Sequence, residues 1–385
     1  MQMNTNFKIW HHPYFGFTSI HAMIQEYSDI TINEYDKSKV DVNEINIIPF
    51  FWENGNQIGI PTIVNTDKFI ELLKELNDLN FFIFADFSTE VYQGVDNTAL
   101  DNLKKILIPN LNLKRFFLVQ NDSTTLSLGK LKYGDVILNT IHIPYFILST
   151  PFYMKKYVND DEYENLEIKK DFLCLNRRIR YPKFIFLKTL WKMGLLDKTH
   201  WTWISSYLPE NIFKDDEFLK EFGVDYYNST TIQLEDDVMY GSELDRADEH
   251  LYTINPKWYY ETKVNLIVET CFYSQPIHIT EKTIKPIYLG IPFVIFASKN
   301  HLNKLKEMGF DVFEKIIGTY DCTSPKSVID AGVRLSKIYN TQEVLDVCNY
   351  NKNLIRNDNF LKKLFENTFI TSIKKLNETN KSKLI

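Results

Sequence analysis

The stretch NRRIR, from Asn176 to Arg180, places three guanidinium groups and one amide between an apolar run and a helix-like segment. Guanidinium groups form bidentate hydrogen bonds with phosphate oxygens, and the free N–H groups at a helix start favour the same negative charge. Asn176, Arg177, Arg178 and Arg180 are therefore predicted to bind a diphosphate. The alternative is a solvated turn whose surface charges contribute little.

A second charged pair, Glu281 and Lys282, follows Thr280 at the start of another helix-like segment. Threonine is a favourable N-cap residue, and the first-turn N–H groups beyond it form a ready anion site to which Lys282 adds a cation. The alternative is an ordinary helix start with an acidic first turn. Two such sites in one half of the chain are harder to attribute to chance than either alone.

Parallel strands alternating with helices would bring these residues to one edge of a sheet, where ligands bind in open α/β folds. Apolar runs without polar alternation are typical of strands covered on both faces, and they predict an α/β fold in both halves. The polar residues expected just after strands are Asp86, Asn121, Arg177 and Glu269. The predicted strands are Ile45–Phe51, Phe81–Ala85, Phe116–Val119, Ile141–Leu148, Asp171–Leu175, His200–Ile204, Val264–Val268 and Gly290–Phe296. The predicted helices include Asp67–Leu76, Tyr181–Leu195, Lys299–Met308 and Lys326–Tyr339.

An acidic stretch that begins at Asp160 is suited to a linker and divides the chain of 385 residues. The predicted domains are residues 1–158, residues 169–350 and a C-terminal helix or tail over residues 351–385. The tail carries eight Lys or Arg against three Asp or Glu, with apolar residues near helical spacing. It is predicted to be an amphipathic helix that packs onto the first domain, or alternatively one that contacts a membrane or nucleic acid.

Several classes of protein are disfavoured by the composition and by missing motifs. The net charge of −6 argues against coating of nucleic acid by bulk charge. Neither G-x-x-x-x-G-K-[ST] nor G-x-G-x-x-G occurs, and zinc-binding and D-x-D patterns are missing, so no metal and no cofactor are expected. The four cysteines are widely spaced, and no leader or run of eighteen apolar residues occurs, which predicts a cytoplasmic chain with no integral membrane segment.

A resemblance to a known family rests on three segments in order. They are VNLIVETCF, IHITEKTIKPIYLGIPFVIFA and LNKLKEMGFDVFEKIIGTYD, with LNRR upstream. They resemble the donor-binding half of the α-1,3-fucosyltransferase-like glycosyltransferases and their bacterial and phage relatives, over roughly Asp171 to Arg334. The resemblance implies a GT-B fold, which consists of two facing Rossmann-like domains, and a nucleoside-diphosphate sugar as co-substrate. The chain departs from the family pattern at Ile284 and at Pro286, and these departures concern the identity of the sugar.

The resemblance also implies roles for individual residues. Glu281 would hold ribose or sugar hydroxyls, Lys282 and Arg177 would neutralise the diphosphate leaving group, and Glu269 would contact the donor sugar or ribose. Such cations are useful because a departing nucleoside diphosphate develops negative charge in the transition state.

An inverting transfer needs a general base in the acceptor domain. FFIFADFSTE offers Asp86 at a strand end and Glu90 four residues later, and Asp86 is preferred. A helix cap or turn residue is the alternative interpretation of Asp86. Three histidines, His11, His12 and His142, are further candidates, although a histidine among aromatic residues is more often a satisfied core group.

The leading hypothesis is a metal-independent, inverting glycosyltransferase that moves a sugar to a hydroxyl acceptor, either a glycan or a lipid-linked saccharide. One alternative is a phage enzyme that glycosylates a hydroxymethylated DNA base, which the basic tail favours and the acidic composition disfavours. The other is a non-catalytic binding protein on a degenerate transferase fold. The sequence leaves the donor, the acceptor and the oligomeric state open.

Overall fold

The protein is described by a computed structural model in which the chain forms two compact units. Unit 1 comprises residues 1–148 and 358–385, and unit 2 comprises residues 149–357. The residues that the structure describes are 7–13, 15, 18–51, 66–87, 112–121, 129–133, 136–158, 163, 166–176, 178–203, 205–206, 212, 216–222, 256–270, 272 and 277–381.

Unit 1 is built on a sheet of seven strands in the order β2-β1-β3-β4-β5-β7-β6, parallel except for the final β7–β6 pair. The strands are β1 (Phe7–His11), β2 (Ile32–Glu34), β3 (Ile45–Phe51), β4 (Phe82–Phe87), β5 (Phe116–Asn121), β6 (Gly129–Tyr133) and β7 (Val136–Ile143). The helical elements in this part of the chain are α1 (Ser19–Tyr27), η1 (Lys37–Lys39), α2 (Thr66–Asp78) and η3 (Leu113–Arg115). The next helix, α4 (Tyr145–Tyr157), begins in unit 1 and continues into unit 2.

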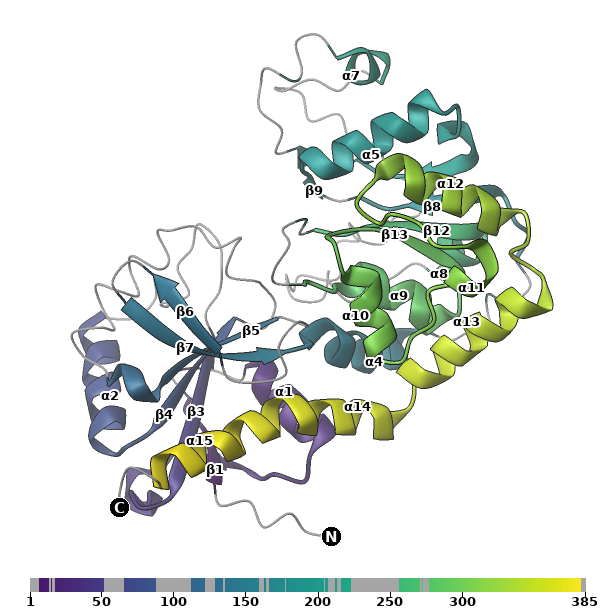
Figure 1. Cartoon of the computed structure of the whole chain (residues 1–385). Helices are drawn as coiled ribbons and strands as arrows, with labels where there is room; N and C mark the ends of the chain where they lie inside the picture. Colours follow the sequence, from purple (N-terminus) through teal and green to yellow (C-terminus); the bar gives the residue numbers. More distant parts are fainter. Residues whose placement is uncertain are drawn as a thin grey trace. The chain divides into compact units, whose positions relative to one another are not determined.

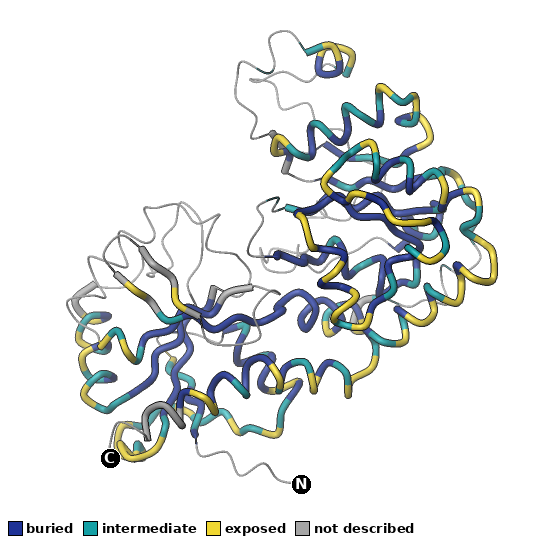
Figure 2. The backbone as a smooth tube through the Cα atoms, in the orientation of Figure 1, coloured by how far each residue is buried: buried dark blue, intermediate teal, exposed yellow. Residues whose placement is uncertain are grey.

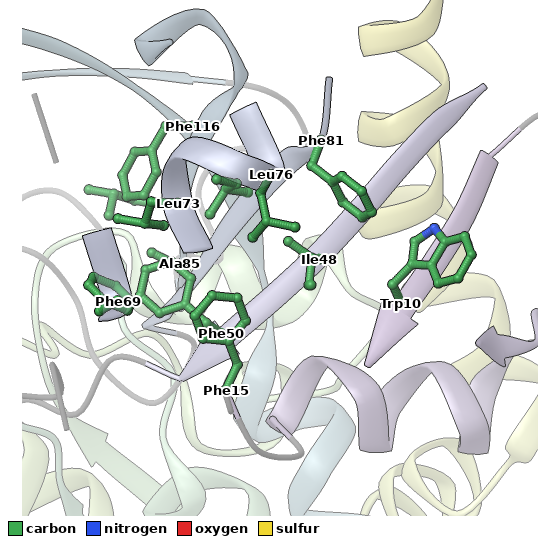
Figure 3. Packing of buried hydrophobic residues seen from close by; sticks show 12 residues of the cluster. Trp10, Phe15, Ile48, Phe50, Phe69, Leu73, Leu76, Phe81, Ala85 and Phe116 are labelled. Atoms are coloured by element: carbon green, nitrogen blue, oxygen red, sulfur yellow. The ribbon is translucent and has the colours of Figure 1, made fainter. Parts of the chain in front are cut away.

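One face of this sheet is covered by α2, which buries Phe69, Leu73 and Leu76 against the strands. The strand side chains that meet them include Phe50 and Ala85, which belong to neighbouring strands and point to the same face (Figure 3). Large apolar side chains of this kind contribute about 1.5–3 kcal/mol each when they are fully buried.

The C-terminal helices belong to unit 1, although the chain reaches them only after completing unit 2. They are α14 (Asp358–Phe365), a π-helical turn η8 (Glu366–Ile370) and α15 (Thr371–Lys381). Phe365 and Phe369 are fully buried, and the Phe369 ring meets Phe84 of β4 edge to face at 6.0 Å. The apolar face of the predicted amphipathic tail therefore packs against the sheet of unit 1.

Unit 2 contains a parallel sheet of four strands in the order β10-β8-β12-β13. They are β8 (Lys170–Cys174), β10 (Thr199–Trp201), β12 (Thr262–Val268) and β13 (Phe293–Phe296), and a short parallel pair joins β9 (Arg178–Ile179) to β11 (Ser205–Ser206). The helical elements are α5 (Tyr181–Lys192), η5 (Leu196–Lys198), α7 (Glu217–Glu221), α8 (Pro256–Tyr260), α9 (Glu281–Leu289), α10 (His301–Glu307), α11 (Glu314–Ile317), α12 (Pro325–Ser336) and α13 (Gln342–Ile355).

Helices cover both faces of the four-stranded sheet, with α5 and α12 on one face and α8, α9 and α13 on the other (Figure 1). The strands β12 and β13 are consequently buried along nearly their whole length, whereas the outer faces of α12 and α13 are exposed (Figure 2). This explains why β12 and β13 lack polar alternation in the sequence. The predicted α/β class with parallel sheets in both halves is confirmed.

Some strand predictions are wrong at their bounds, and the strand predicted over Gly290–Phe296 begins only at Phe293. The strand expected over Ile141–Leu148 ends at Ile143, and α4 begins at Tyr145, directly after Pro144. Pro144 lacks an N–H but is well tolerated at a helix start, so an apolar run that continues through it can change from strand to helix. Among the described residues, no helix is both long enough and apolar enough to span a bilayer.

Candidate ligand site at the carboxyl edge of the second sheet

The carboxyl ends of β8 and β12 form the topological switch point of unit 2. The chain leaves β8 through α5 to reach β10 on one side, and it leaves β12 through α9 to reach β13 on the other side. Neighbouring parallel strands whose connections diverge in this way leave a crevice between them, and ligands of open α/β sheets bind there. The N-terminal turns of α5 and α9 both follow strands that end at this edge.

Asn176 lies just beyond β8 and is fully buried. Its backbone N–H donates to the Thr202 hydroxyl at 2.7 Å, and that hydroxyl donates back to the Asn176 carbonyl at 3.2 Å. Its side-chain Nδ2 lies 3.3 Å from the Cys174 sulfur, whereas its Oδ1 has no hydrogen-bond partner among the residues that the structure describes. A buried acceptor without a partner is costly, which makes this oxygen a candidate for contact with a ligand.

Glu269 lies directly after β12, and its buried carboxylate is occupied by neighbouring donors. One oxygen accepts from the Thr280 N–H at 3.1 Å and from the Thr283 hydroxyl at 2.6 Å. The other accepts from the Thr280 hydroxyl at 2.7 Å and from the Thr270 N–H at 3.3 Å. Glu269 therefore fastens the end of β12 to the start of α9. This arrangement favours a bracing role over the predicted contact with a sugar.

The first turn of α9 carries the predicted Glu281–Lys282 pair. Thr280 is the N-cap, as predicted, and its hydroxyl accepts from the Lys282 N–H at 3.2 Å. Lys282 Nζ lies 2.6 Å from Glu281 Oε1, and their side chains are 25% and 11% exposed. Burial alone would raise the pKa of Glu281, but Lys282, Lys285 and hydrogen bonds outweigh it and lower this pKa to about 2. The pair is ionised at neutral pH.

The first turn of α5 carries a lysine that the sequence analysis did not single out. Lys183 is buried one residue after Pro182, which stands in the first helical turn as predicted. Burial lowers the pKa of Lys183 to about 7, with further lowering by Lys282 and Arg180 and opposing effects from Glu281 and Glu269. Burial raises the pKa of the Cys174 thiol at the end of β8, and the charge of Lys183 partly opposes this rise. The signal in the sequence is a lysine three residues into a helix that follows a strand end.

The predicted arginines are placed unequally. Arg180 is the exposed N-cap residue of α5. Arg178 lies in β9, where its backbone is paired with Ser205 of β11. Arg177 lies outside the described residues. The described residues that the structure brings to this edge are thus Asn176, Arg180, Lys183, Glu269, Thr280, Glu281 and Lys282.

This arrangement can bind an anion. Two helix N-termini supply N–H groups and the positive ends of their dipoles, and Arg180, Lys183 and Lys282 add cationic side chains. Lys282 is only partly exposed, so its interaction with an anion is screened less by water than that of a surface lysine.

The preferred base candidate of unit 1, Asp86, occupies a structural position. Asp86 is 1% exposed near the end of β4, and its carboxylate accepts from the N–H of Ile20 in the first turn of α1 at 3.1 Å. This contact matches the alternative interpretation of Asp86 as a helix cap. Glu90 lies outside the described residues.

The candidate histidines also have partners. His11 pairs with Glu34 at 3.1 Å, and the buried His142 shares a 2.9 Å hydrogen bond with Thr140. The ring of His12 lies 4.8 Å from that of Tyr35, and burial lowers the pKa of His12.

Among the side chains that the structure describes, no three His, Cys, Asp or Glu residues gather in a way that could hold a metal ion. Comparison of the chain with protein-family models, curated proteins and solved structures finds no significant match.

Proposed function

We propose that the protein is a glycosyltransferase of GT-B type that uses a nucleoside-diphosphate sugar, and that unit 2 binds this donor. One observation carries the proposal: α5 and α9 begin at the switch point between β8 and β12 and bring Arg180, Lys183 and Lys282 to that edge. The resemblance to fucosyltransferase-like enzymes covers the same unit, and its T-E-K motif is the capped start of α9.

The chemistry explains why such a site suits sugar transfer. When the acceptor hydroxyl attacks the anomeric carbon, the bond from that carbon to the diphosphate oxygen breaks, the nucleoside diphosphate leaves with its electrons, and the hydroxyl proton passes to a general base. Fixed cations and helix N-termini stabilise this developing charge because they are oriented before the reaction. In this proposal Lys282 neutralises the diphosphate, and Glu281, which is held ionised beside it, accepts hydrogen bonds from ribose or sugar hydroxyls.

The role of Glu269 differs from the one that the resemblance implies. The carboxylate of Glu269 accepts hydrogen bonds from Thr270, Thr280 and Thr283. In this proposal Glu269 therefore fixes the start of α9, and with it the position of Glu281 and Lys282. The expected acceptor is a hydroxyl of a glycan or of a lipid-linked saccharide.

The proposal is tested by release of nucleoside diphosphate from a panel that contains GDP-fucose, GDP-mannose, UDP-glucose and UDP-galactose. Many transferases hydrolyse their donor slowly without an acceptor, so release from one donor class identifies an enzyme. Lys282→Ala is expected to lose this activity, whereas Lys326→Ala keeps it because Lys326 is exposed on α12 and paired with Asp330. Stable binding of a donor without any release, with or without hydroxyl acceptors, would instead favour the non-catalytic alternative.

A further inference from the structure

Lys183 is buried where cationic side chains are expensive. It is 4% exposed in the first turn of α5, and the other buried residues of this helix, Phe184, Phe186, Leu187 and Leu190, are all apolar. An ammonium group that leaves water loses several kcal/mol of hydration unless nearby charges compensate. A helix with this buried face would ordinarily carry an apolar residue at the position of Lys183.

The charges that act on Lys183 come from both sides of the switch point. Arg180 belongs to its own helix, Lys282 and Glu281 belong to α9, and Glu269 follows β12. The two cations oppose its protonation. The two carboxylates favour protonation of Lys183. However, Glu281 also forms an ion pair with Lys282, and Glu269 accepts hydrogen bonds from Thr280 and Thr283.

Other elements packed against α5 carry charged groups that are engaged elsewhere. On α12, Lys326 pairs with Asp330, and Arg334 donates to the Ile317 carbonyl at 2.9 Å. The electrostatic environment of Lys183 is therefore dominated by the charged groups of the switch point.

A second observation at this edge points to a ligand independently of the charges. Asn176 Oδ1 is buried at the end of β8 without a hydrogen-bond partner in the described part of the chain. An acceptor oxygen in this state suits a hydroxyl or N–H donor. A nucleoside-diphosphate sugar carries both features, since it has an anionic diphosphate and several hydroxyl groups.

We propose that Lys183 is a third diphosphate-binding cation beside Arg180 and Lys282, and that the protein takes up a proton on Lys183 when the ligand binds. This inference rests on the proposed function, because it assigns the ligand to the same site. The proton comes from solvent, and no covalent bond changes.

The direction of the pH effect follows from the state of the free site. Because burial lowers the pKa of Lys183 to about 7 in the free protein, this lysine is only partly protonated near neutral pH. A bound diphosphate favours the ammonium form and raises that pKa, so binding consumes a fraction of a proton at pH 7. Affinity should fall as the pH rises above 7, by at most about tenfold per pH unit.

The experiment is isothermal titration calorimetry of the full chain with the member of the nucleotide-sugar panel that binds. A nucleotide sugar is the suitable probe because its diphosphate is a diester and does not titrate near pH 7. Titrations at pH 7 in two buffers with different ionisation enthalpies measure the protons taken up. Lys183→Met removes the charge and keeps much of the volume, and Lys192→Met is the matched control on the exposed last turn of α5.

The wild-type protein and Lys192→Met are expected to take up a measurable fraction of a proton and to lose affinity between pH 7 and pH 8.5. Lys183→Met is expected to bind about 10- to 100-fold more weakly, without proton uptake. Binding by wild type without proton uptake would overturn the inference even if no variant folds, and so would unchanged affinity in Lys183→Met; both results leave the proposed function standing. If no member of the panel binds, the proposed function fails and the inference fails with it.

Discussion

The Glu269 carboxylate accepts two hydrogen bonds from Thr280, one from its backbone N–H at 3.1 Å and one from its hydroxyl at 2.7 Å. The two residues are eleven positions apart, and they join the end of β12 to the N-cap of α9. The start of α9, with Glu281 and Lys282, is therefore held in place by the protein itself. A site fixed in this way needs little reorganisation when a ligand binds.

Replacing Glu269 should destabilise the fold. Glu269→Ala would leave the Thr280 N–H and the hydroxyls of Thr280 and Thr283 without their acceptor, at about 1–3 kcal/mol for each buried group left unsatisfied. Urea unfolding measures the loss. Glu343→Ala, an exposed change on α13, is the control. A Glu269→Ala protein that is as stable as wild type but has lost only ligand affinity would show that Glu269 contacts the ligand and does not brace α9.

Lys183→Met should stabilise the protein in a pH-dependent way. The pKa of Lys183 is lowered from 10.5 to about 7 by folding, so the unfolded chain binds the extra proton between these values. The cost of burying Lys183 is therefore full below pH 7 and is relieved as the pH rises toward 10.5.

Urea unfolding at pH 6.5 and pH 9 tests this expectation. Lys183→Met should exceed wild type in unfolding free energy at pH 6.5, and the difference should shrink at pH 9, whereas Lys192→Met should follow wild type at both values. An equal difference at both pH values would mean that Lys183 is not desolvated.

The C-terminal helices should be essential to unit 1. Phe369 is fully buried and meets Phe84 edge to face, so Phe369→Ala is expected to cost about 3–5 kcal/mol. Lys374→Ala, on the exposed side of α15, should change stability by less than about 0.5 kcal/mol. Truncation after Asn357 should give an unstable or insoluble protein. A truncated chain that melts like the full one would contradict the packing of this segment.

Ligand binding should not require a divalent cation. The charge of the diphosphate is met by Arg180, Lys183 and Lys282 in the proposed site, so affinity and donor turnover are expected to survive excess EDTA. Measuring both quantities before and after chelation tests this. Loss of turnover that manganese restores would show that a metal ion shares the role assigned to these side chains.

The central strands of both sheets were predictable because they are largely apolar, whereas β1, β2 and β6 carry more polar residues and were not predicted. The strand predicted over Ile45–Phe51 is β3 itself, and those predicted over Asp171–Leu175 and Val264–Val268 differ from β8 and β12 by one or two residues. Thr280 was identified as a cap because capping depends on local sequence. The packing of residues 358–385 onto unit 1 was predicted beside an alternative, a helix that contacts a membrane or nucleic acid. The sequence alone did not decide between them, because contacts such as Phe84 with Phe369 join distant parts of the chain.

The site was less predictable than the fold. Residues at strand ends follow from the strand pattern, which is why Asp86 and Glu269 were found. Their hydrogen-bond partners depend on the tertiary structure, and these partners show both carboxylates at helix starts. Lys183 was not predicted as a site residue because a lysine in an amphipathic helix is usually solvated. Only the packing of α5 shows that it is buried.

The most direct test of the central claim, donor binding at the switch point of unit 2, is thermal unfolding of the full chain with each nucleotide sugar of the panel. A donor at one hundred times its Kd should stabilise the protein by about 2.7 kcal/mol. Lys282→Ala should bind this donor more weakly, with a loss of about 1.5–3 kcal/mol of binding free energy, whereas Lys326→Ala should bind it as wild type does. Stabilisation by no member of the panel, or equal stabilisation of wild type and Lys282→Ala across a full concentration series, would contradict the account.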